Sequence, residues 1–461
     1  MTRRQLLERL LLGAPILALA ACGGDDEDDE EQPRAAPEAP EAAVPQVARE
    51  PVTLRLASVQ DQFAGAVERT VEQWNEGAVP DVPEDILLEQ VGGPRVAPSR
   101  DILVFIERAQ AGATAYLTEQ DSAGTPPDLI LFNRQFDFPW VFGSGLIQPL
   151  DRYLQQDPTE PLGKFLPAAL ELARYRSQTM ALPVALDVGV ARYNPRQFEN
   201  AGIPLPDQGW TREEFVSAAQ RLTEDTDNDG KVDEWGFRPI DVFANWLPFV
   251  MQEMDGDVVD LDTGAVRLTD PAALRGLYFW DELGRIHSIM PHGTTVTGDQ
   301  FGTNFTSLLT SILFWNFLPP GYNLPGQQVS LPAGPREGTP MMLSSALAIP
   351  TIASDAAQSY EALRPLALSL GQRLPWPPAI AGQQFIEKPS MDYLEIMLPE
   401  YERQLALHLL ATARPSLLAT SFYMTYQLFE RMTLPLARGE IGVEQAAQQA
   451  QDWLKSYLSE P

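Results

Sequence analysis

The densest group of metal-ligand side chains is a short acidic stretch in the middle of the chain. Four carboxylates share it, three of them at alternate positions: Asp225, Asp227, Asp229 and Asp233. Hard cations such as calcium require several oxygen ligands at about 2.3 to 2.6 Å, and this spacing can supply them from one short loop. Gly230 stands at the turn, and Lys231 can offer its carbonyl oxygen. The pattern predicts a calcium loop with a structural rather than a catalytic role.

This loop lacks one ligand of a full EF-hand. Its twelfth position is Gly236, where an EF-hand has a bidentate glutamate. The missing carboxylate lowers the affinity that we expect for calcium. Two interpretations therefore stay open, a structural calcium ion and an acidic turn that binds no ion.

Residues in the arrangements that catalysis requires are scarce. The three histidines, His287, His292 and His408, have no metal-ligand spacing with one another or with a cysteine. The sequence at 143–145 is not a five-residue nucleophile elbow, and no glycine-rich phosphate loop is present. Cys22 is the only cysteine, so an intramolecular disulfide is excluded. We expect no enzyme and no catalytic cofactor, although the paired carboxylates of a glycoside hydrolase follow no fixed sequence spacing.

The first residues have the features of an export signal. Arg3 and Arg4 precede an apolar run at 10–21, which is too short to span a bilayer. Small residues stand immediately before Cys22, which resembles the lipobox of bacterial lipoproteins, where the cysteine is cleaved to the new N-terminus and diacylated. The arginine pair also resembles a twin-arginine signal, with Glu8 where that pattern usually has a basic residue.

The next segment, residues 22–50, has the composition of a tether. Seven consecutive acids occupy 25–31, and an Ala/Pro/Glu stretch follows. Such a segment has nothing to bury and its like charges repel, so we expect an extended, disordered spacer. The formal net charge of the whole chain is −30, which argues against binding to nucleic acid or to anionic lipid head groups.

The body begins with alternating strand and helix patterns. We expect strands at 52–57, 85–91 and 128–132, a helix from about residue 62 to Gly77, and an amphipathic run near 102–109. Alternation of this kind predicts a mainly parallel sheet covered by helices. Ligands of such sheets bind at the carboxyl ends of the strands, which places Phe132, Asn133 and Arg134 near a binding edge.

Further elements follow to the end of the chain. These are an extended run at 180–194, a helix opened by the capping box of Thr211 and Glu214, a hairpin with its turn at 262–264, a helix from Pro271 to about 283, and a final helix at 443–458. About 410 residues follow residue 50, which is long for one core and comfortable for two lobes.

The order of several short segments resembles the extracellular solute-binding proteins of carbohydrate ABC importers, the maltodextrin-binding group among them. The resemblance covers roughly 51–350 and is carried by segments at 127–130, 145–151, 181–183 with 193–194, 201–203 through 210–215, 233–236 and 348–350. It implies an α/β protein of the two-lobed, type II periplasmic-binding-protein fold, in which helices flank parallel-type sheets and the ligand binds in a cleft between lobes.

The resemblance also implies a division of the chain. We assign 1–21 to a signal peptide with lipobox, 22–50 to the lipidated cysteine and tether, and 51–150 to the first part of lobe 1. Residues 151–344 form the main part of lobe 2, and 345–461 return to lobe 1 with C-terminal helices that pack on both lobes.

Sugar recognition needs flat aromatic faces against the pyranose and carboxylates or amides against hydroxyls. Asp187, four residues after Pro183, matches a position where such relatives carry an acidic residue, with a salt bridge of the hinge strand as the alternative. Phe314 precedes Trp315, where the family commonly has glycine. The candidate ligand-binding residues are Phe132, Asn133, Arg134, Asp187, Trp246, Trp315, Tyr322 and Trp376.

The resulting hypothesis is a monomeric receptor, anchored outside the cytoplasm by lipidated Cys22, in the periplasm or on the outer face of the cytoplasmic membrane. It binds a sugar-like solute and delivers it to ABC permease subunits, touches the membrane only through its lipid and binds no nucleic acid. Two alternatives stay open: a secreted carbohydrate-active hydrolase and a structural lipoprotein without transport function.

Overall fold

The computed structural model describes eleven stretches of the chain: 50–58, 64–95, 102–133, 136–157, 161–239, 245–260, 263–294, 296, 312–316, 326–371 and 400–459. The signal-like run, Cys22 and the tether lie outside them. Residues Arg49–Pro461 form one compact unit. Within the described stretches, no helix is both long enough and apolar enough to cross a membrane.

The first part of this unit is the predicted β-α-β-α-β series. Strands β1 (Val52–Ser58), β2 (Ile86–Gly92) and β3 (Leu129–Asn133) are parallel, with helices α2 (Ala64–Asn75) and α3 (Ile102–Ser122) between them. Helix α2 buries the apolar face that its sequence predicts, formed by Ala66, Val67, Val71 and Trp74. The prediction of a parallel, helix-covered sheet is confirmed.

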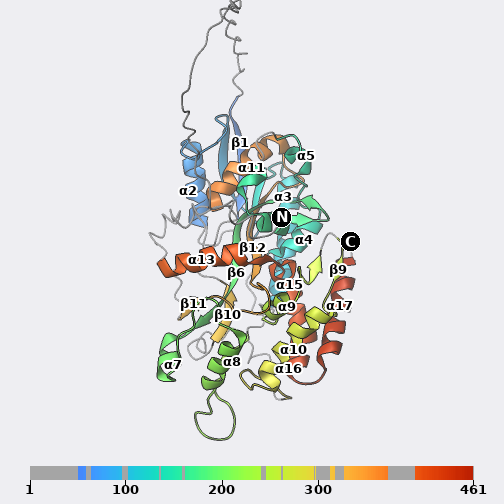
Figure 1. Cartoon of the computed structure of the whole chain (residues 1–461). Helices are drawn as coiled ribbons and strands as arrows, with labels where there is room; N and C mark the ends of the chain where they lie inside the picture. The colour runs from blue at the N-terminus through green and yellow to red at the C-terminus, as the bar shows by residue number, and fades with distance from the viewer. Residues whose placement is uncertain are drawn as a thin grey trace, which may run out of the picture. The chain divides into compact units, whose positions relative to one another are not determined.

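Two long antiparallel strands continue this sheet. The strand order is β2-β1-β3-β12-β6-β10-β7, and β6 (Leu182–Tyr193) and β12 (Pro340–Ala348) lie near its middle (Figure 1). Strand β6 pairs with β12 in its first half and with β10 (Ile312–Asn316) and β11 (Gln327–Val329) in its second half. The short strand β7 (Phe237–Arg238) pairs with β10. One continuous sheet therefore passes through the body.

Buried side chains form two separate hydrophobic cores, which define two lobes. The core of lobe 1 extends along the chain to Val190 and that of lobe 2 begins at Ala191, both within β6. The chain returns to the first core between Leu331 and Met341 and reaches the second again between Leu409 and Leu418. Within the described stretches, three segments thus connect the lobes.

The predicted start of lobe 2 at residue 151 is therefore too early. Helices α4 (Phe138–Gly143), α5 (Asp151–Leu154) and α6 (Pro167–Leu172) pack on the first core. The hairpin strands β4 (Arg174–Tyr175) and β5 (Gln178–Thr179) follow, and Tyr175 contacts both cores. A short 3-10 turn spans Pro161–Lys164. The crossing takes place inside an uninterrupted strand, where burial does not change along the sequence.

Lobe 2 contains the helices α7 (Pro195–Asn200), α8 (Arg212–Arg221), α9 (Leu247–Glu253) and α10 (Pro271–Arg285). The capping box of α8 is present: Thr211 Oγ1 accepts from Glu214 N at 3.1 Å, and Glu214 Oε2 accepts from Thr211 N at 2.7 Å. The predicted hairpin is formed by β8 (Val259–Asp260) and β9 (Ala265–Val266), which are antiparallel.

The C-terminal elements divide between the lobes. Helices α11 (Ala356–Gly371) and α13 (Glu400–Thr412) contribute to the first core. Strand β13 (Arg414–Pro415) then pairs with β12, and α14 (Leu417–Thr420), α15 (Phe422–Leu428), a π-helical turn (Phe429–Thr433), α16 (Leu434–Ala437) and α17 (Val443–Ser459) contribute to the second. Helix α17 packs beside α10 (Figure 1).

Candidate functional site

The carboxyl ends of β1, β2 and β3 lie along one edge of the lobe 1 sheet. Ser58 is in register with Gly92, and Ser345 of β12 lies opposite Asn133. Gln90 Nε2 donates to Ser58 Oγ at 3.1 Å. Hydroxyl and amide groups thus gather where parallel sheets bind their ligands. The segments that follow the three strand ends, 59–63, 96–101 and 134–135, lie outside the described residues.

Asp187 lies where β6 leaves lobe 1. Its side chain is buried, with an exposed fraction of 0 %, and the residue faces Met342 of β12 in the ladder. Two residues later, Gly189 begins the pairing with β10 of lobe 2. A carboxylate therefore occupies the junction between the lobes, at the position predicted for it.

A small cavity lies at the same junction, with a volume of about 30 Å³. Gly189 and Met342 line it from the crossing strands, and Asn245, Phe314 and Thr425 line it from lobe 2. Asn245 is buried, and its Oδ1 accepts from Trp280 Nε1 at 3.0 Å. The cavity has room for about one water molecule, so these walls alone do not enclose a sugar.

Asp137 is a functional candidate that sequence reasoning missed. It precedes α4 with a positive φ of 53°, and its carboxyl group is buried. Ser421, at the start of α15, donates from its Oγ to Asp137 Oδ1 at 2.5 Å. Burial raises the pKa of Asp137 to about 6, against the effect of the hydrogen bond from Ser421. Its only sequence signal is an aspartate shortly after a strand end.

Two predicted aromatic ligand residues belong to the cores. Phe132 is 1 % exposed and packs edge-on against Phe136 at 5.5 Å between ring centroids. Trp246 is likewise 1 % exposed, in the core of lobe 2. Neither ring presents a face at a surface, because β3 is covered on both sides and Trp246 precedes a helix that is buried almost throughout.

The other predicted ligand residues divide into two groups. Asn133 is half-buried at the sheet edge. Trp315 lies in β10 opposite Val190, but its side chain is outside the described part, as are Arg134, Tyr322 and Trp376. Among the described residues, the structure therefore places Asp187 on the crossing strand, Asn133 at the edge of the lobe 1 sheet, and Phe132 and Trp246 in the cores.

Half-buried aromatic rings occur instead on α15 and α17. Trp453 and Tyr457 stack at 5.4 Å with an interplanar angle of 12°, and Tyr423 lies 5.2 Å from Tyr457. The Arg431 guanidinium lies 5.4 Å from the Trp453 ring. Tyr423 N also approaches Asp137 Oδ1 at 3.4 Å, which links this aromatic group to lobe 1. In the sequence, the spacing of four residues between Trp453 and Tyr457 indicates that both rings lie on one face of a helix. This spacing fits packing against a neighbouring helix equally well.

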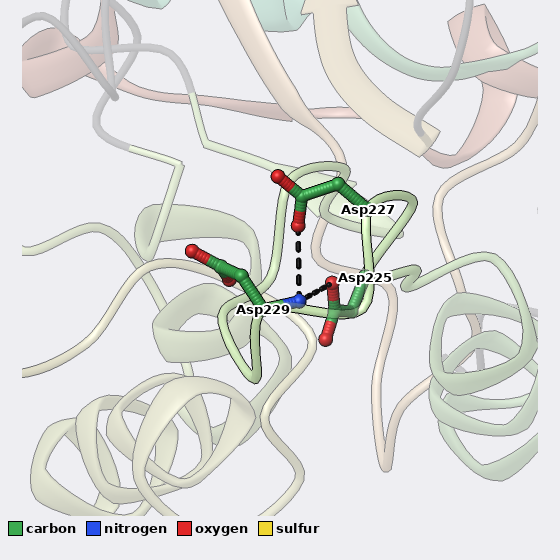
Figure 2. A group of neighbouring side chains, drawn as sticks. All are labelled: Asp225, Asp227 and Asp229. Carbon is green, nitrogen blue, oxygen red and sulfur yellow. Dashed lines mark hydrogen bonds between the residues drawn. The ribbon is translucent and has the colours of Figure 1, made fainter.

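The acidic loop after α8 gathers three of the predicted calcium ligands. Oxygen atoms of Asp225, Asp227 and Asp229 lie within 4.8 Å of one another, and Asp229 N donates to both other carboxylates (Figure 2). Lys231 Nζ pairs with Asp229 Oδ2 at 3.1 Å. These oxygen donors fit a hard cation, although the ammonium group competes for one of them.

Asp233 takes a different part in the loop. Its Oδ2 accepts from Thr226 Oγ1 and Thr226 N, both at 2.7 Å. The hydrogen bond from the Thr226 hydroxyl, followed by that from the backbone, holds the pKa of Asp233 below its ordinary value. The Asp233 carboxylate thus closes the loop by its hydrogen bonds to Thr226. It is not one of the three carboxylates that lie close together.

Sequence comparison agrees with this architecture. Residues 106–299 match the family described as bacterial extracellular solute-binding protein. This segment of the chain is therefore similar to bacterial extracellular solute-binding proteins. The matched segment includes β3, the crossing strand β6 and much of lobe 2, so it contains one of the three connections between the lobes.

Solved solute-binding proteins share the fold. A cyclo/maltodextrin-binding protein in complex with maltotetraose has a TM-score of 0.62 at 13 % identity, covering 90 % of this chain and 99 % of its own. A cyclic α-maltosyl-1,6-maltose binding protein from Arthrobacter globiformis has 0.61 at 16 % identity, with 88 % and 99 % covered. An ABC substrate-binding protein from Listeria monocytogenes, in complex with cycloalternan, has 0.60 at 15 % identity, with 89 % and 100 % covered. The predicted two-lobed fold is confirmed.

Proposed function

We propose that this protein is an extracytoplasmic receptor that binds a small polar solute, a sugar or oligosaccharide, and delivers it to an ABC importer. The observation that carries the proposal is the lobe junction. Two cores are joined by three segments in the described part of the chain, and the buried carboxylate of Asp187 lies on the strand that crosses from one core to the other. Lobes joined in this way can close on a guest without altering it.

The chemistry of the lobe 1 sheet edge and of the crossing strand supports a sugar-like ligand. Ser58, Gln90, Asn133 and Asp187 offer hydroxyl, amide and carboxylate groups, which suit neutral hydroxyl-rich molecules. The structural neighbours with maltotetraose, cyclic maltosyl-maltose and cycloalternan are named for such ligands. A receptor role also agrees with the family description, which names binding proteins.

The proposal extends to the location and partners of the protein. Lipidation of Cys22 would hold the body near the permease subunits, and the acidic tether would give it reach. The net charge of −30 disfavours nucleic acid and anionic membrane surfaces as partners. Contact with the membrane then passes through the lipid alone, and one copy of the chain suffices for the function.

A thermal-shift screen against mono-, di- and oligosaccharides and polyols tests this function. A ligand present at 100 times its Kd stabilises the folded state by about 2.7 kcal/mol, which raises the melting temperature measurably. The expected result is a rise with at least one sugar and no new product in the incubated mixture. Absence of any rise across the panel refutes the receptor, and release of shorter sugars favours the hydrolase.

We also propose that the acidic loop binds calcium as a structural ion. Asp225, Asp227 and Asp229 would supply carboxylate oxygens and Lys231 its carbonyl, and Asp233 would join after leaving Thr226. Repeating the screen with a chelator tests this. A fall in melting temperature that calcium restores, and that Asp227→Asn abolishes, is the expected result; a chelator without effect overturns it.

A further inference from the structure

The segment 414–423 is one of the three connections between the lobes and contains two serine-capped helices. Ser416 Oγ accepts from Ala419 N at 3.2 Å at the start of α14. Ser421 Oγ accepts from Met424 N at 3.0 Å at the start of α15. Because a serine hydroxyl has one proton and two lone pairs, each can still donate one hydrogen bond.

Each serine donates that hydrogen bond to an aspartate, and the two aspartates come from different lobes. Ser416 Oγ donates to Asp257 Oδ1 at 3.0 Å, and Leu417 N donates to Asp257 Oδ2 at 2.7 Å. Ser421 Oγ donates to Asp137 Oδ1 at 2.5 Å. Asp257 precedes the lobe 2 core residues Val258 and Val259, whereas Asp137 lies between Phe136 and Phe138 of the lobe 1 core.

We propose that Asp137 and Asp257 are positioning residues: from opposite lobes they hold the two ends of segment 414–423, and they thereby fix the relative setting of the lobes on which ligand affinity depends. This inference rests on the receptor function proposed above. Neither carboxylate needs to touch the ligand for it to hold.

The environment of Asp137 makes its hold depend on its charge. Its described hydrogen-bond partners are uncharged, the Ser421 hydroxyl and backbone N–H groups, and its Oδ2 has no well-formed hydrogen bond within the described stretches. Burial raises its pKa to about 6. Because burial raises this pKa, the buried arrangement favours the neutral carboxyl group over the ionised one, so the arrangement that holds Ser421 is firm below this pH and weakened as pH rises through it.

Asp257 has the same charge state but different neighbours. Burial raises its pKa to about 6 as well, against hydrogen bonds from Val258 N, Leu417 N and Ser416 Oγ. The guanidinium groups of Arg267 and Arg414 donate to the backbone carbonyls of Asp257 and Gly256, not to the carboxylate.

The surface beside Asp257 is an open groove of about 720 Å³. The other charged residues that line it are Glu171, Arg174, Asp260 and Arg267. Helix α6 supplies Glu171 and strand β4 supplies Arg174, whereas Asp260 and Arg267 come from the β8–β9 hairpin region of lobe 2. Solvent in the groove gives the Asp257 carboxyl group a route for proton exchange that leaves the rest of the fold intact.

The first test measures ligand affinity between pH 7.5 and 5.0, using the full chain with Cys22→Ser and a sugar that raises its melting temperature. We expect affinity to rise about fivefold from pH 7.5 to 5.0, because the arrangement that buries the two carboxyl groups favours their protonated forms. The double variant D137N/D257N, which carries no titrating group at these positions, should have the same affinity at both pH values. A flat profile of the unmodified pair, or an unchanged profile in the double variant, overturns the inference.

A matched control separates positioning from general stability. Asp128 is also buried and hydrogen-bonded, but its partners, Ser354 Oγ at 2.6 Å and Arg55 N at 2.9 Å, belong to lobe 1. Asp128→Asn should therefore keep the pH profile of the affinity even if it lowers the melting temperature. If it removes the profile as D137N/D257N does, the effect is not specific to the segment and the inference fails.

A second test is independent of any ligand. The chain has one cysteine, so Cys22→Ser allows a spin-label pair at Glu72→Cys of lobe 1 and Glu199→Cys of lobe 2, both exposed. The inter-label distance should shift between pH 7.5 and 5.0 and should not shift in D137N/D257N. If that variant does not fold, S416A/S421A removes the hydroxyls instead. A pH-independent distance overturns the inference, whereas failure of every sugar to bind refutes only the receptor.

Discussion

A methyl group at residue 236 would collide with the backbone of α8. The Cβ of an alanine there would lie 1.8 Å from the carbonyl oxygen of Ala219 and 2.5 Å from its carbon. Real Cβ contacts are essentially never below 3.0 Å, so β7 and α8 must separate by more than 1 Å at this point. Gly236 also joins the two through its N–H, which donates to Thr223 Oγ1 at 3.0 Å.

We therefore expect Gly236→Ala to lower the free energy of unfolding by about 3 kcal/mol, the upper part of the range for overpacked sites. Urea unfolding followed by tryptophan fluorescence measures the change. Gly163→Ala is the matched control, because its Cβ would meet nothing within 4 Å. Gly236→Glu, which would complete the EF-hand pattern, should lose the same stability and gain no calcium affinity by titration calorimetry. A Gly236→Ala variant as stable as the parent would refute the close approach.

Three further changes test other contacts. Asp137 has a higher pKa in the folded state than in the unfolded state, so the parent loses stability as pH rises through about 6, whereas Asp137→Asn does not. The variant should therefore gain up to about 3 kcal/mol in its free energy of unfolding relative to the parent, measured by urea unfolding at each pH. A difference that is constant from pH 4 to 8 contradicts this. Arg212→Met should cost about 2 kcal/mol, because it breaks a largely buried pair with Glu253 at 3.0 Å, while Arg275 keeps Glu253 paired; a melting temperature equal to the parent's would count against it. Thr211→Ala should cost about 1 kcal/mol in the same assay by removing the α8 cap, and retention of full stability would mean that the cap contributes nothing.

Local patterns predicted the elements well where one physical cause dominates. The capping box at Thr211 and the apolar spacing from Ala66 to Trp74 gave correct helices, because caps and periodicity act within a few residues. The lobe boundary was missed for the opposite reason. All twelve residues of β6 are buried, so nothing along the strand marks the passage from one core to the other.

The residues of the lobe junction were harder to predict because it is assembled from distant segments. Asp187 was proposed from a family resemblance; the structure places it on the crossing strand, and its role toward a ligand stays a prediction. Asp137 was missed, because its burial depends on Ser421, which follows it by 284 residues. Phe132 was expected at a surface, but β3 is covered on both faces, and alternation alone does not distinguish such a strand from one with a free face.

The path of β6 has a mechanical consequence. Since this strand forms ladders with β12 in lobe 1 and with β10 and β11 in lobe 2, the lobes cannot swing on slack linkers at this point. Any rotation of one lobe against the other must twist these hydrogen-bonded ladders, which resist the twist elastically. In the receptor proposed above, closure of the lobes on a ligand would work against this resistance, and opening would relieve it.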